Sequence, residues 1–468
     1  MKKLLFTAFI LFTTIGLFAQ DISGQWNGIL KIQGIQLRLV FHISASEKGY
    51  SATMDSPDQG VSDIPVTSVR FEDNTLVLEV ANAGIQYEGS LNEAHVFEGT
   101  FKQGGQSLPL ELTMDEVKAE KIKRPQEPAP PYPYYTEEVK FKNNEAEITL
   151  AGTLTMPAKK GDFPAVILIS GSGPQNRDEE LMGHKPFLVI ADFLTRNGIA
   201  VLRFDDRGTA ESTGDFETAT TFDFATDVKS AVRYLKKRKE IDKSKIGLIG
   251  HSEGGIIAPI VAANSKDVDF IVLLAGTGIR GDQLLLLQQE LVGRARGMNE
   301  TDLEKTKQVS KGAFDLILQI EDTDSLKLQL THYLRQTLGD YPANTLPEGM
   351  TEAAFIDNQV TQLTSPWMYN FIKYDPSLIL EEVSCPVLAI NGEKDLQVPS
   401  AVNLKAIEKA LERGNNTNVT TKELANLNHL FQECETGSPD EYAEIEQTFS
   451  PMALDTVLNW LKKVIQEE

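Results

Sequence analysis

The chain is poor in cysteine, in basic residues and in long apolar runs, and each shortage excludes a class of protein. Its 468 residues include only two cysteines, Cys385 and Cys434, so a disulfide-rich scaffold is excluded. The 45 basic residues are outnumbered by 67 acidic ones, and the net charge of −22 argues against nucleic acid or an anionic membrane as a partner. Beyond residue 20, no apolar run is long enough to span a bilayer.

The two cysteines are expected to be free and buried. Cys385 begins a predicted strand, and Cys434 lies beyond the other end of that strand. A strand of about six residues separates its ends by about 20 Å. A disulfide needs Cα atoms within about 7 Å, so this pair is too far apart.

Residues 1–20 have the pattern of an export signal. Lys2 and Lys3 form a charged start, a mostly apolar run extends from Leu4 to Phe18, and Ala19 is a small residue suited to cleavage. The apolar run is shorter than the roughly 20 residues that a membrane-spanning helix needs. We therefore expect a signal peptide over residues 1–20 and an exported mature protein, periplasmic or secreted.

The most informative segment is Gly250-His251-Ser252-Glu253-Gly254-Gly255. It follows a short apolar run and precedes a helix-like stretch of small residues, which is the context of a nucleophile elbow. Such a turn exposes a serine hydroxyl, and the glycines leave room around it. We therefore predict Ser252 to be a nucleophile. A glycine-rich turn whose serine only caps the helix is the alternative.

A nucleophilic serine needs a histidine base, and in this type of fold the base follows the serine in the chain. Of the six histidines, only His332 and His429 do so. His332 lies in a helix-like stretch, which indicates a surface or packing role. His429 lies in a loop-like segment after a predicted strand, so it is the candidate base.

The acid that orients this base is expected at the end of another strand. Residues 386–390 read as a buried strand that runs into a turn-rich loop containing Glu393 and Asp395. Asp395 is the candidate acid because it precedes the only suitable histidine with room for one helix and one strand between them. Glu393 is the alternative.

The oxyanion of the reaction needs two backbone N–H donors. One is expected from Glu253, the residue after the nucleophile, and the other from the loop after an earlier strand. Residues 164–169 read as such a strand, and the glycine-rich loop that follows supplies Ser172. An ordinary glycine-rich loop is the alternative.

With these motifs in place, the chain from about Glu137 to Glu468 resembles the α/β-hydrolases. Within them it is similar to bacterial serine hydrolases grouped with lysophospholipases, serine aminopeptidases and dienelactone hydrolases. The segments that carry the resemblance are ISGSGPQNRDE, RFDDRGTAESTG, IGLIGHSEGG, LAINGEKDLQVP and NHLFQ. The pattern of such families is D-x-R-G-x-G-x-S, and here Ala210 takes the place of its second glycine.

The chain is expected to contain two folded parts. Residues 21–120 show short alternating strands separated by turn signals, which predicts a small antiparallel β-sandwich or barrel of about eight strands. A proline-rich linker, expected to be an extended spacer, covers residues 121–136. Residues 137–468 then alternate strands and helices, which predicts an α/β fold with a mostly parallel sheet.

A helical cap is expected to interrupt that sheet at about residues 278–378. The helical patterns within it cover residues 282–294, 301–320, 325–338 and 352–373. Trp367 and Phe371 are candidates for lining an acyl pocket, and their packing of the cap onto the core is an equally good interpretation. No metal-ligand cluster is visible in the sequence, and no cofactor is expected.

These observations predict an exported serine hydrolase that cleaves small-molecule carboxylic esters by a Ser-His-Asp mechanism. An aminopeptidase or amidase with the same three residues is one alternative. A glycan- or partner-binding protein with a degenerate hydrolase domain is the other. Fold alone does not decide the substrate, and the oligomeric state is not indicated.

Overall fold

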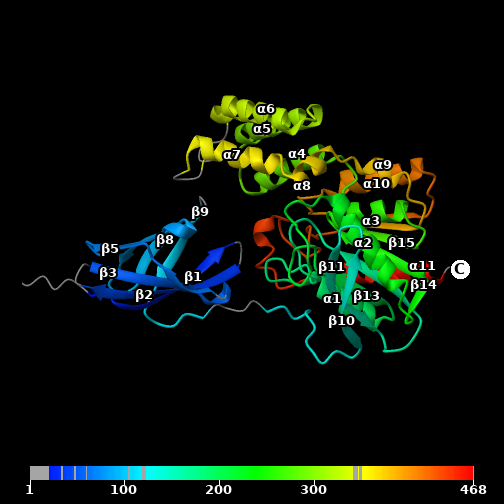
Figure 1. The fold of residues 1–468 in the computed structure, drawn as a ribbon, viewed down its shortest axis with the longest axis horizontal. Helices are drawn as coiled ribbons and strands as arrows, with labels where there is room; N and C mark the ends of the chain where they lie inside the picture. The colour runs from blue at the N-terminus through cyan, green and yellow to red at the C-terminus, as the bar shows by residue number, and fades with distance from the viewer. Residues whose placement is uncertain are drawn as a thin grey trace, which may run out of the picture. The chain divides into compact units, whose positions relative to one another are not determined.

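The chain folds into two compact units in a computed structural model, and Figure 1 shows their secondary structure. The structure describes residues 21–32, 35–46, 49–59, 61–103, 106–118, 123–340, 346 and 350–466. The first unit holds residues 1–32 and 36–120, and the second holds residues 121–468 together with residues 33–35. The predicted signal peptide, residues 1–20, lies outside the described residues.

The first unit is built of antiparallel strands in two sheets. One sheet contains β1 (Gly24–Ile32), β2 (Ile35–Ser46), β3 (Gly49–Ser56) and β4 (Val61–Pro65), in that order. The other contains β5 (Ser68–Glu72), β6 (Thr75–Val80), β7 (Ile85–Leu91), β8 (Phe97–Gln103) and β9 (Gln106–Leu112). Asn27 of β1 and Thr113, just after β9, exchange backbone hydrogen bonds of 2.7 and 2.9 Å, which join the two sheets.

Apolar and polar residues alternate along these strands, so the apolar face of each sheet packs into the core of the first unit. Trp26, Phe41, Tyr87 and Phe97 are fully buried there, and the rings of Trp26 and Phe97 lie 4.6 Å apart. The sequence-based prediction of a small antiparallel β-domain is confirmed, with nine strands among the described residues rather than about eight.

The second unit is built on one sheet in the order β10-β11-β13-β12-β14-β15-β16-β17. Its strands are β10 (Tyr135–Asn143), β11 (Ile148–Met156), β12 (Phe163–Ile169), β13 (Ala200–Phe204), β14 (Ile241–His251), β15 (Phe270–Leu274), β16 (Val387–Gly392) and β17 (Val419–Leu424). The pairs β10–β11 and β11–β13 are antiparallel, and the remaining pairs are parallel. The predicted mostly parallel sheet is confirmed.

Helices cover both faces of this sheet, which is why β12 and β15 are apolar along their whole length. Residues of α2 (Thr221–Leu235), α3 (Gly254–Ala263), α9 (Pro376–Leu380) and α10 (Ser400–Arg413) join the core on one face. Residues of α1 (Pro186–Arg196) and α11 (Pro451–Gln466) join the core on the other. No helix in the described part of the chain is long and apolar enough to cross a membrane.

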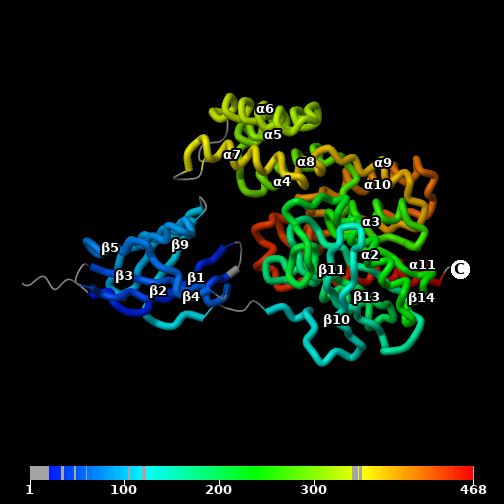
Figure 2. The backbone as a smooth tube through the Cα atoms, in the orientation of Figure 1, coloured from blue at the N-terminus to red at the C-terminus, as the bar shows by residue number. Residues whose placement is uncertain are grey.

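A helical cap lies between β15 and β16, as expected. It consists of α4 (Gly281–Ala295), α5 (Glu300–Gln319), α6 (Thr323–Thr337), α7 (Glu352–Leu363) and α8 (Pro366–Lys373). Figure 2 shows the chain leaving the sheet for this group of helices and returning to it. Their buried apolar residues form a small core of their own, which includes Phe314, Leu330 and Ile356.

The helix predicted over residues 352–373 is in fact two helices. Ser365 caps α8 by accepting a hydrogen bond from the N–H of Met368, and Pro366 occupies the first position of that helix. Since a residue before proline avoids the helical conformation, the Ser365-Pro366 pair breaks the predicted helix.

The proline-rich linker makes hydrogen bonds to the second unit. Arg124 donates hydrogen bonds of 2.7 Å to the carbonyl oxygens of Ala443 and Ile445, and Gln126 donates one of 2.6 Å to Phe449. The N–H of Lys185 donates in turn to Glu127. Residues from 123 onward are therefore anchored to the body of the second unit by polar side chains that lie among the prolines.

Candidate active site

Ser252 lies in a sharp turn between β14 and α3, and its φ of 53° is one that L residues adopt at a cost. Its N–H donates to the carbonyl oxygen of Leu274 at 2.9 Å, which fixes the turn against β15. A Cβ at Gly250 would lie 1.9 Å from the carbonyl oxygen of Gly254. Only glycine fits there, which is the reason the sequence pattern needs it.

His429 and Asp395 are brought together at the end of the sheet. His429 Nδ1 lies 2.8 Å from Oδ2 of Asp395, and both side chains are buried. The other carboxylate oxygen of Asp395 accepts from the backbone N–H groups of Gln397 and Val398, both at 2.8 Å. The carboxylate is thus held in one orientation toward the imidazole.

The alternative residues lie elsewhere. Glu393 is exposed, and its side chain accepts a hydrogen bond from the N–H of Asn426 rather than from His429. His332 is exposed on α6. Of the two acids and the two histidines weighed from the sequence, the structure pairs Asp395 with His429.

The loop after β12 passes directly beside the serine. A Cβ added to Gly171 would lie 3.2 Å from the Cβ of Ser252, so the next residue, Ser172, is also close to it. Within the described residues, the backbone N–H groups of Ser172 and Glu253 donate to no protein acceptor. Both donors proposed from the sequence are therefore available to a ligand.

The side chain of Asp206 holds this loop in place through two hydrogen bonds. Its Oδ1 accepts from the hydroxyl of Ser170 at 2.7 Å, and its Oδ2 accepts from the N–H of Gln175 at 3.0 Å. Burial raises the pKa of Asp206 to about 8, against the hydrogen bonds from Ser170 and Gln175, which lower it. One carboxyl group thus fixes both ends of the loop of residues 170–175. This loop carries the candidate oxyanion donor Ser172 and is named the oxyanion loop for it.

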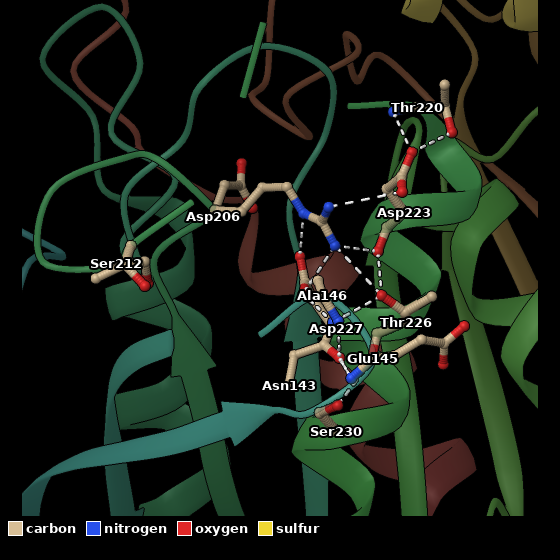
Figure 3. A network of polar contacts seen from close by, with 12 residues as sticks. Asn143, Glu145, Ala146, Asp206, Ser212, Thr220, Asp223, Thr226, Asp227 and Ser230 are labelled. Atoms are coloured by element: carbon tan, nitrogen blue, oxygen red, sulfur yellow. Dashed lines mark hydrogen bonds and ion pairs between the residues drawn. The ribbon is translucent and has the colours of Figure 1, made fainter. Parts of the chain in front are cut away.

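Arg207, the next residue, anchors the loop after β13 to the helical layer. Its Nε donates to Asp227 of α2 at 2.8 Å. Figure 3 shows the polar network around Asp227. Asn143, at the end of β10, donates to the same carboxylate at 2.7 Å. Ala210 in this loop has a φ of 47°, a backbone conformation that glycine adopts more readily than alanine.

Two buried residues of the site were missed by sequence reasoning. Glu179 Oε1 accepts from the N–H of Gly171 at 2.7 Å and lies 2.9 Å from His251 Nδ1. His251 Nε2 lies 3.0 Å from the backbone carbonyl oxygen of His429. His251 is a polar residue at the buried end of β14, which indicates that it needs a hydrogen-bond partner. The sequence does not identify Glu179 as that partner.

Trp367 and Phe371 serve mainly as packing residues. Their rings stack with centroids 5.0 Å apart, and Phe371 is buried against the main core of the hydrolase unit. Trp367 Nε1 also donates a hydrogen bond of 2.8 Å to Oε1 of Glu253. Neither residue lines the cavity among the cap helices, and a pocket-lining role for them stays a prediction.

A cavity of about 510 Å³ lies among the five cap helices. Its lining includes Met368 of α8 and also Gln397, whose N–H donates to Asp395. The lining is mostly apolar with five glutamines, and none of its described residues is acidic. The cap helices therefore border a mostly apolar space without acidic side chains, beside the loop that carries Asp395.

The two cysteines and any metal-binding cluster are further candidates for functional groups among the described residues. Cys385 and Cys434 are unpaired, as expected, but both are partly exposed rather than buried. Among the described residues, no group of three or more histidine, cysteine or acidic side chains is arranged to hold a metal ion.

Comparison with known proteins places this geometry in a family. The sequence model of the X-Pro dipeptidyl-peptidase (S15) family matches residues 147–414, more than half of the chain. Esterase EstD of Thermotoga maritima is 27% identical over 340 residues, which cover 71% of this chain and 70% of that protein. An uncharacterised 31.7 kDa protein of Escherichia coli is 24% identical over 69% of this chain and 99% of its own length.

Among solved structures, the α/β-hydrolase GrgF of a Penicillium species aligns with a TM-score of 0.43 and 18% identity, over 70% of this chain and 98% of its own. A similarity with this TM-score and this sequence identity carries no argument about function. The family match and the observed sheet, elbow and cap agree with each other. The chain belongs to the X-Pro dipeptidyl-peptidase (S15) family and is a serine hydrolase of the α/β-hydrolase superfamily.

Proposed function

We propose that the protein hydrolyses carboxylic esters of uncharged acyl groups, with Ser252, His429 and Asp395 as its catalytic triad. The single observation that carries the proposal is the buried pair of His429 and Asp395, 2.8 Å apart, at the sheet end that also holds the strained Ser252. A histidine held by a carboxylate near a serine in such a turn is the arrangement used for acyl transfer.

In the proposed reaction, the Ser252 hydroxyl oxygen attacks the acyl carbon and its proton passes to His429. The carbon–oxygen bond to the alcohol breaks, and His429 returns the proton to the departing alcohol. Water then attacks the acyl-enzyme with His429 as base, which releases the acid and restores Ser252. Asp395 orients His429, and the N–H groups of Ser172 and Glu253 bind the oxyanion.

The cap cavity supports an uncharged acyl group as substrate. A charged group buried in a protein needs a partner of opposite charge. The lining offers no acidic partner for an ammonium group, and its arginine, Arg296, is already paired with Asp440 at 2.7 Å. Apolar side chains with glutamines among them suit a neutral acyl chain. The name of the relative esterase EstD supports the same substrate class.

Cleavage of peptides is the second candidate, and the family description favours it. A dipeptidyl-peptidase must accept the free ammonium group of its substrate. The buried acids nearest Ser252 already have partners, since Glu253 accepts from Thr221 and Trp367, and Glu179 accepts from Gly171. The alternative of a degenerate, non-enzymatic domain is disfavoured by membership of a hydrolase family.

Export is also part of the proposal, and it rests on the sequence pattern of residues 1–20 alone. Cleavage after Ala19 would release a mature protein to the periplasm or medium. Sequencing the N-terminus of the protein isolated from its own cells tests this directly. An N-terminus that still begins at Met1 would contradict it.

A substrate panel tests the function. The full-length protein is assayed on p-nitrophenyl acetate, butyrate and octanoate, and on aminoacyl and Xaa-Pro p-nitroanilides. We expect kcat/KM to be higher for the esters than for either class of anilide by a factor of at least about 10. A higher kcat/KM for the Xaa-Pro anilide would favour the peptidase instead.

The role of the cavity is tested by filling it. Ser310 of α5 lines the cavity, and Ser310→Phe places a ring inside it. We expect the octanoate-to-acetate ratio of kcat/KM to fall by about 10-fold or more. The matched control is Leu328→Phe on the exposed surface of α6. An unchanged ratio in Ser310→Phe would place the acyl group elsewhere.

A further inference from the structure

Glu179 and His251 form a buried polar connection between two parts of the site that are far apart in the sequence. Glu179 is 3% exposed and His251 is 7% exposed. Through one carboxylate oxygen, Glu179 holds both the N–H of Gly171 in the oxyanion loop and the Nδ1 of His251. Through its other nitrogen, His251 reaches the backbone of His429.

The partners of the His251 ring define its protonation. The carbonyl oxygen of His429 only accepts hydrogen bonds, so Nε2 of His251 must carry a hydrogen to bond it at 3.0 Å. The oxygen of Glu179 already accepts from Gly171, and an ionised carboxylate is also only an acceptor. A neutral imidazole has a single N–H and satisfies one of these contacts, whereas an imidazolium satisfies both.

We propose that ionised Glu179 and doubly protonated His251 are a pair of positioning residues that fixes the oxyanion loop and the base on either side of Ser252. This inference rests on the proposed function and adds two residues to the site. Neither residue touches the substrate. Glu179 sets Gly171 beside the serine, and His251 sets the backbone of His429.

The surroundings of His251 favour its charge. Burial by itself would lower the pKa of His251, but the charge and hydrogen bond of Glu179 outweigh it and raise the pKa above its ordinary value. The carbonyl of His429 and the more distant carboxylate of Asp395 act in the same direction. The ring of Phe431 is the apolar neighbour, with centroids 6.4 Å apart.

The two rings also lie close together. The rings of His251 and His429 have centroids 4.9 Å apart, so His251 packs against the side chain of the proposed base as well as bonding its backbone. At alkaline pH, His251 loses its proton and one of its two hydrogen bonds, so catalysis should decline there.

The test is Glu179→Gln in the full-length protein. The amide keeps the size of the side chain but removes the charge that holds the extra proton on His251. We expect kcat for p-nitrophenyl butyrate to fall by about 100-fold with KM little changed, because the reacting groups shift while the substrate pocket stays intact. We also expect the alkaline limb of the kcat/KM profile to move to lower pH.

The matched control is Glu180→Gln. Glu180 is the next residue and is exposed, and its side chain bonds to Asn176 and Lys185 rather than to His251. If Glu179→Gln keeps the kcat and pH profile of Glu180→Gln, the inference is overturned. The proposed function would stand in that case, since fluorophosphonate labelling of Ser252 tests it separately.

A second measurement keeps the inference testable if Glu179→Gln fails to fold. The wild-type protein with ¹⁵N-labelled histidine reports the charge of His251 without any substrate, and His251→Asn identifies its signal. At about pH 6.5, the ordinary histidine pKa, we expect most His251 rings to carry two protonated nitrogens, because the pKa of His251 is raised. A neutral His251 ring at that pH would overturn the inference.

Discussion

Trp367 Nε1 donates a hydrogen bond of 2.8 Å to Oε1 of Glu253, so cap helix α8 is joined to the residue that follows Ser252. The same oxygen accepts from the hydroxyl of Thr221 at the start of α2, at 2.6 Å. Burial raises the pKa of Glu253, and these two hydrogen bonds lower it. The position of the cap is thereby coupled to the backbone that supplies one of the proposed oxyanion donors.

Trp367→Phe should lower both stability and turnover. Phenylalanine keeps the stacking on Phe371 but leaves Glu253 with one donor fewer in a buried place, at a cost of about 1–3 kcal/mol. We expect kcat on p-nitrophenyl acetate to fall by about 10-fold, since the N–H of Glu253 loses its fixed position. Trp460→Phe on α11 is the control. Equal kcat in the two variants would show that the hydrogen bond only holds the cap in place.

Asp395→Asn should lower kcat by about 10⁴-fold with the fold intact, because an amide favours the wrong tautomer of His429. The control is Glu393→Gln, which alters the other acid of the same loop. That variant should keep most of its activity, since Glu393 bonds only the N–H of Asn426. A larger loss of kcat in Glu393→Gln than in Asp395→Asn would show that Glu393, and not Asp395, orients His429.

Asp206→Asn should stabilise the protein at neutral and alkaline pH. The pKa of Asp206 is about 8 in the folded protein and near 3.8 in the unfolded chain. Its contribution to stability is therefore present below about pH 3.8 and is lost as the pH rises to about 8. Asparagine does not titrate, so the Tm of Asp206→Asn minus that of wild type should increase over this range. Calorimetry at several pH values measures it, and a constant difference would contradict the raised pKa.

Two truncated chains test the anchoring of the linker. A chain that begins at residue 123 keeps the hydrogen bonds of Arg124 and Gln126 to the hydrolase unit, whereas one that begins at residue 135 loses them. Each hydrogen bond contributes about 0.5–1.5 kcal/mol, so the shorter chain should unfold at lower urea concentration. Ester hydrolysis should persist in the longer chain. Identical urea midpoints would mean that the linker adds nothing to stability.

Much of the site could be predicted from the sequence because its chemistry follows local patterns. The turn around Ser252 needs glycine at 250 for a steric reason that the structure bears out, and strand ends supply Asp395 and the oxyanion loop. The order of serine, acid and base along the chain selected His429 from six histidines. Each of these inferences needs only one segment and its place on a strand.

The parts that could not be predicted depend on contacts between distant segments. Glu179 and His251 are 72 positions apart, and no local pattern pairs them. The bond from Trp367 to Glu253 spans 114 positions, and no local pattern pairs these two residues. The anchoring of Arg124 depends on carbonyl oxygens more than 300 residues later, which composition does not reveal.

The central claim is that Ser252 is the nucleophile of a hydrolase, and covalent labelling tests it most directly. A fluorophosphonate probe reacts only with an activated serine, and intact-mass analysis counts the groups that are attached. We expect one label per wild-type chain, located at Ser252 by peptide mapping, and no label on a folded Ser252→Ala protein. Stoichiometric labelling of Ser252→Ala would contradict the account.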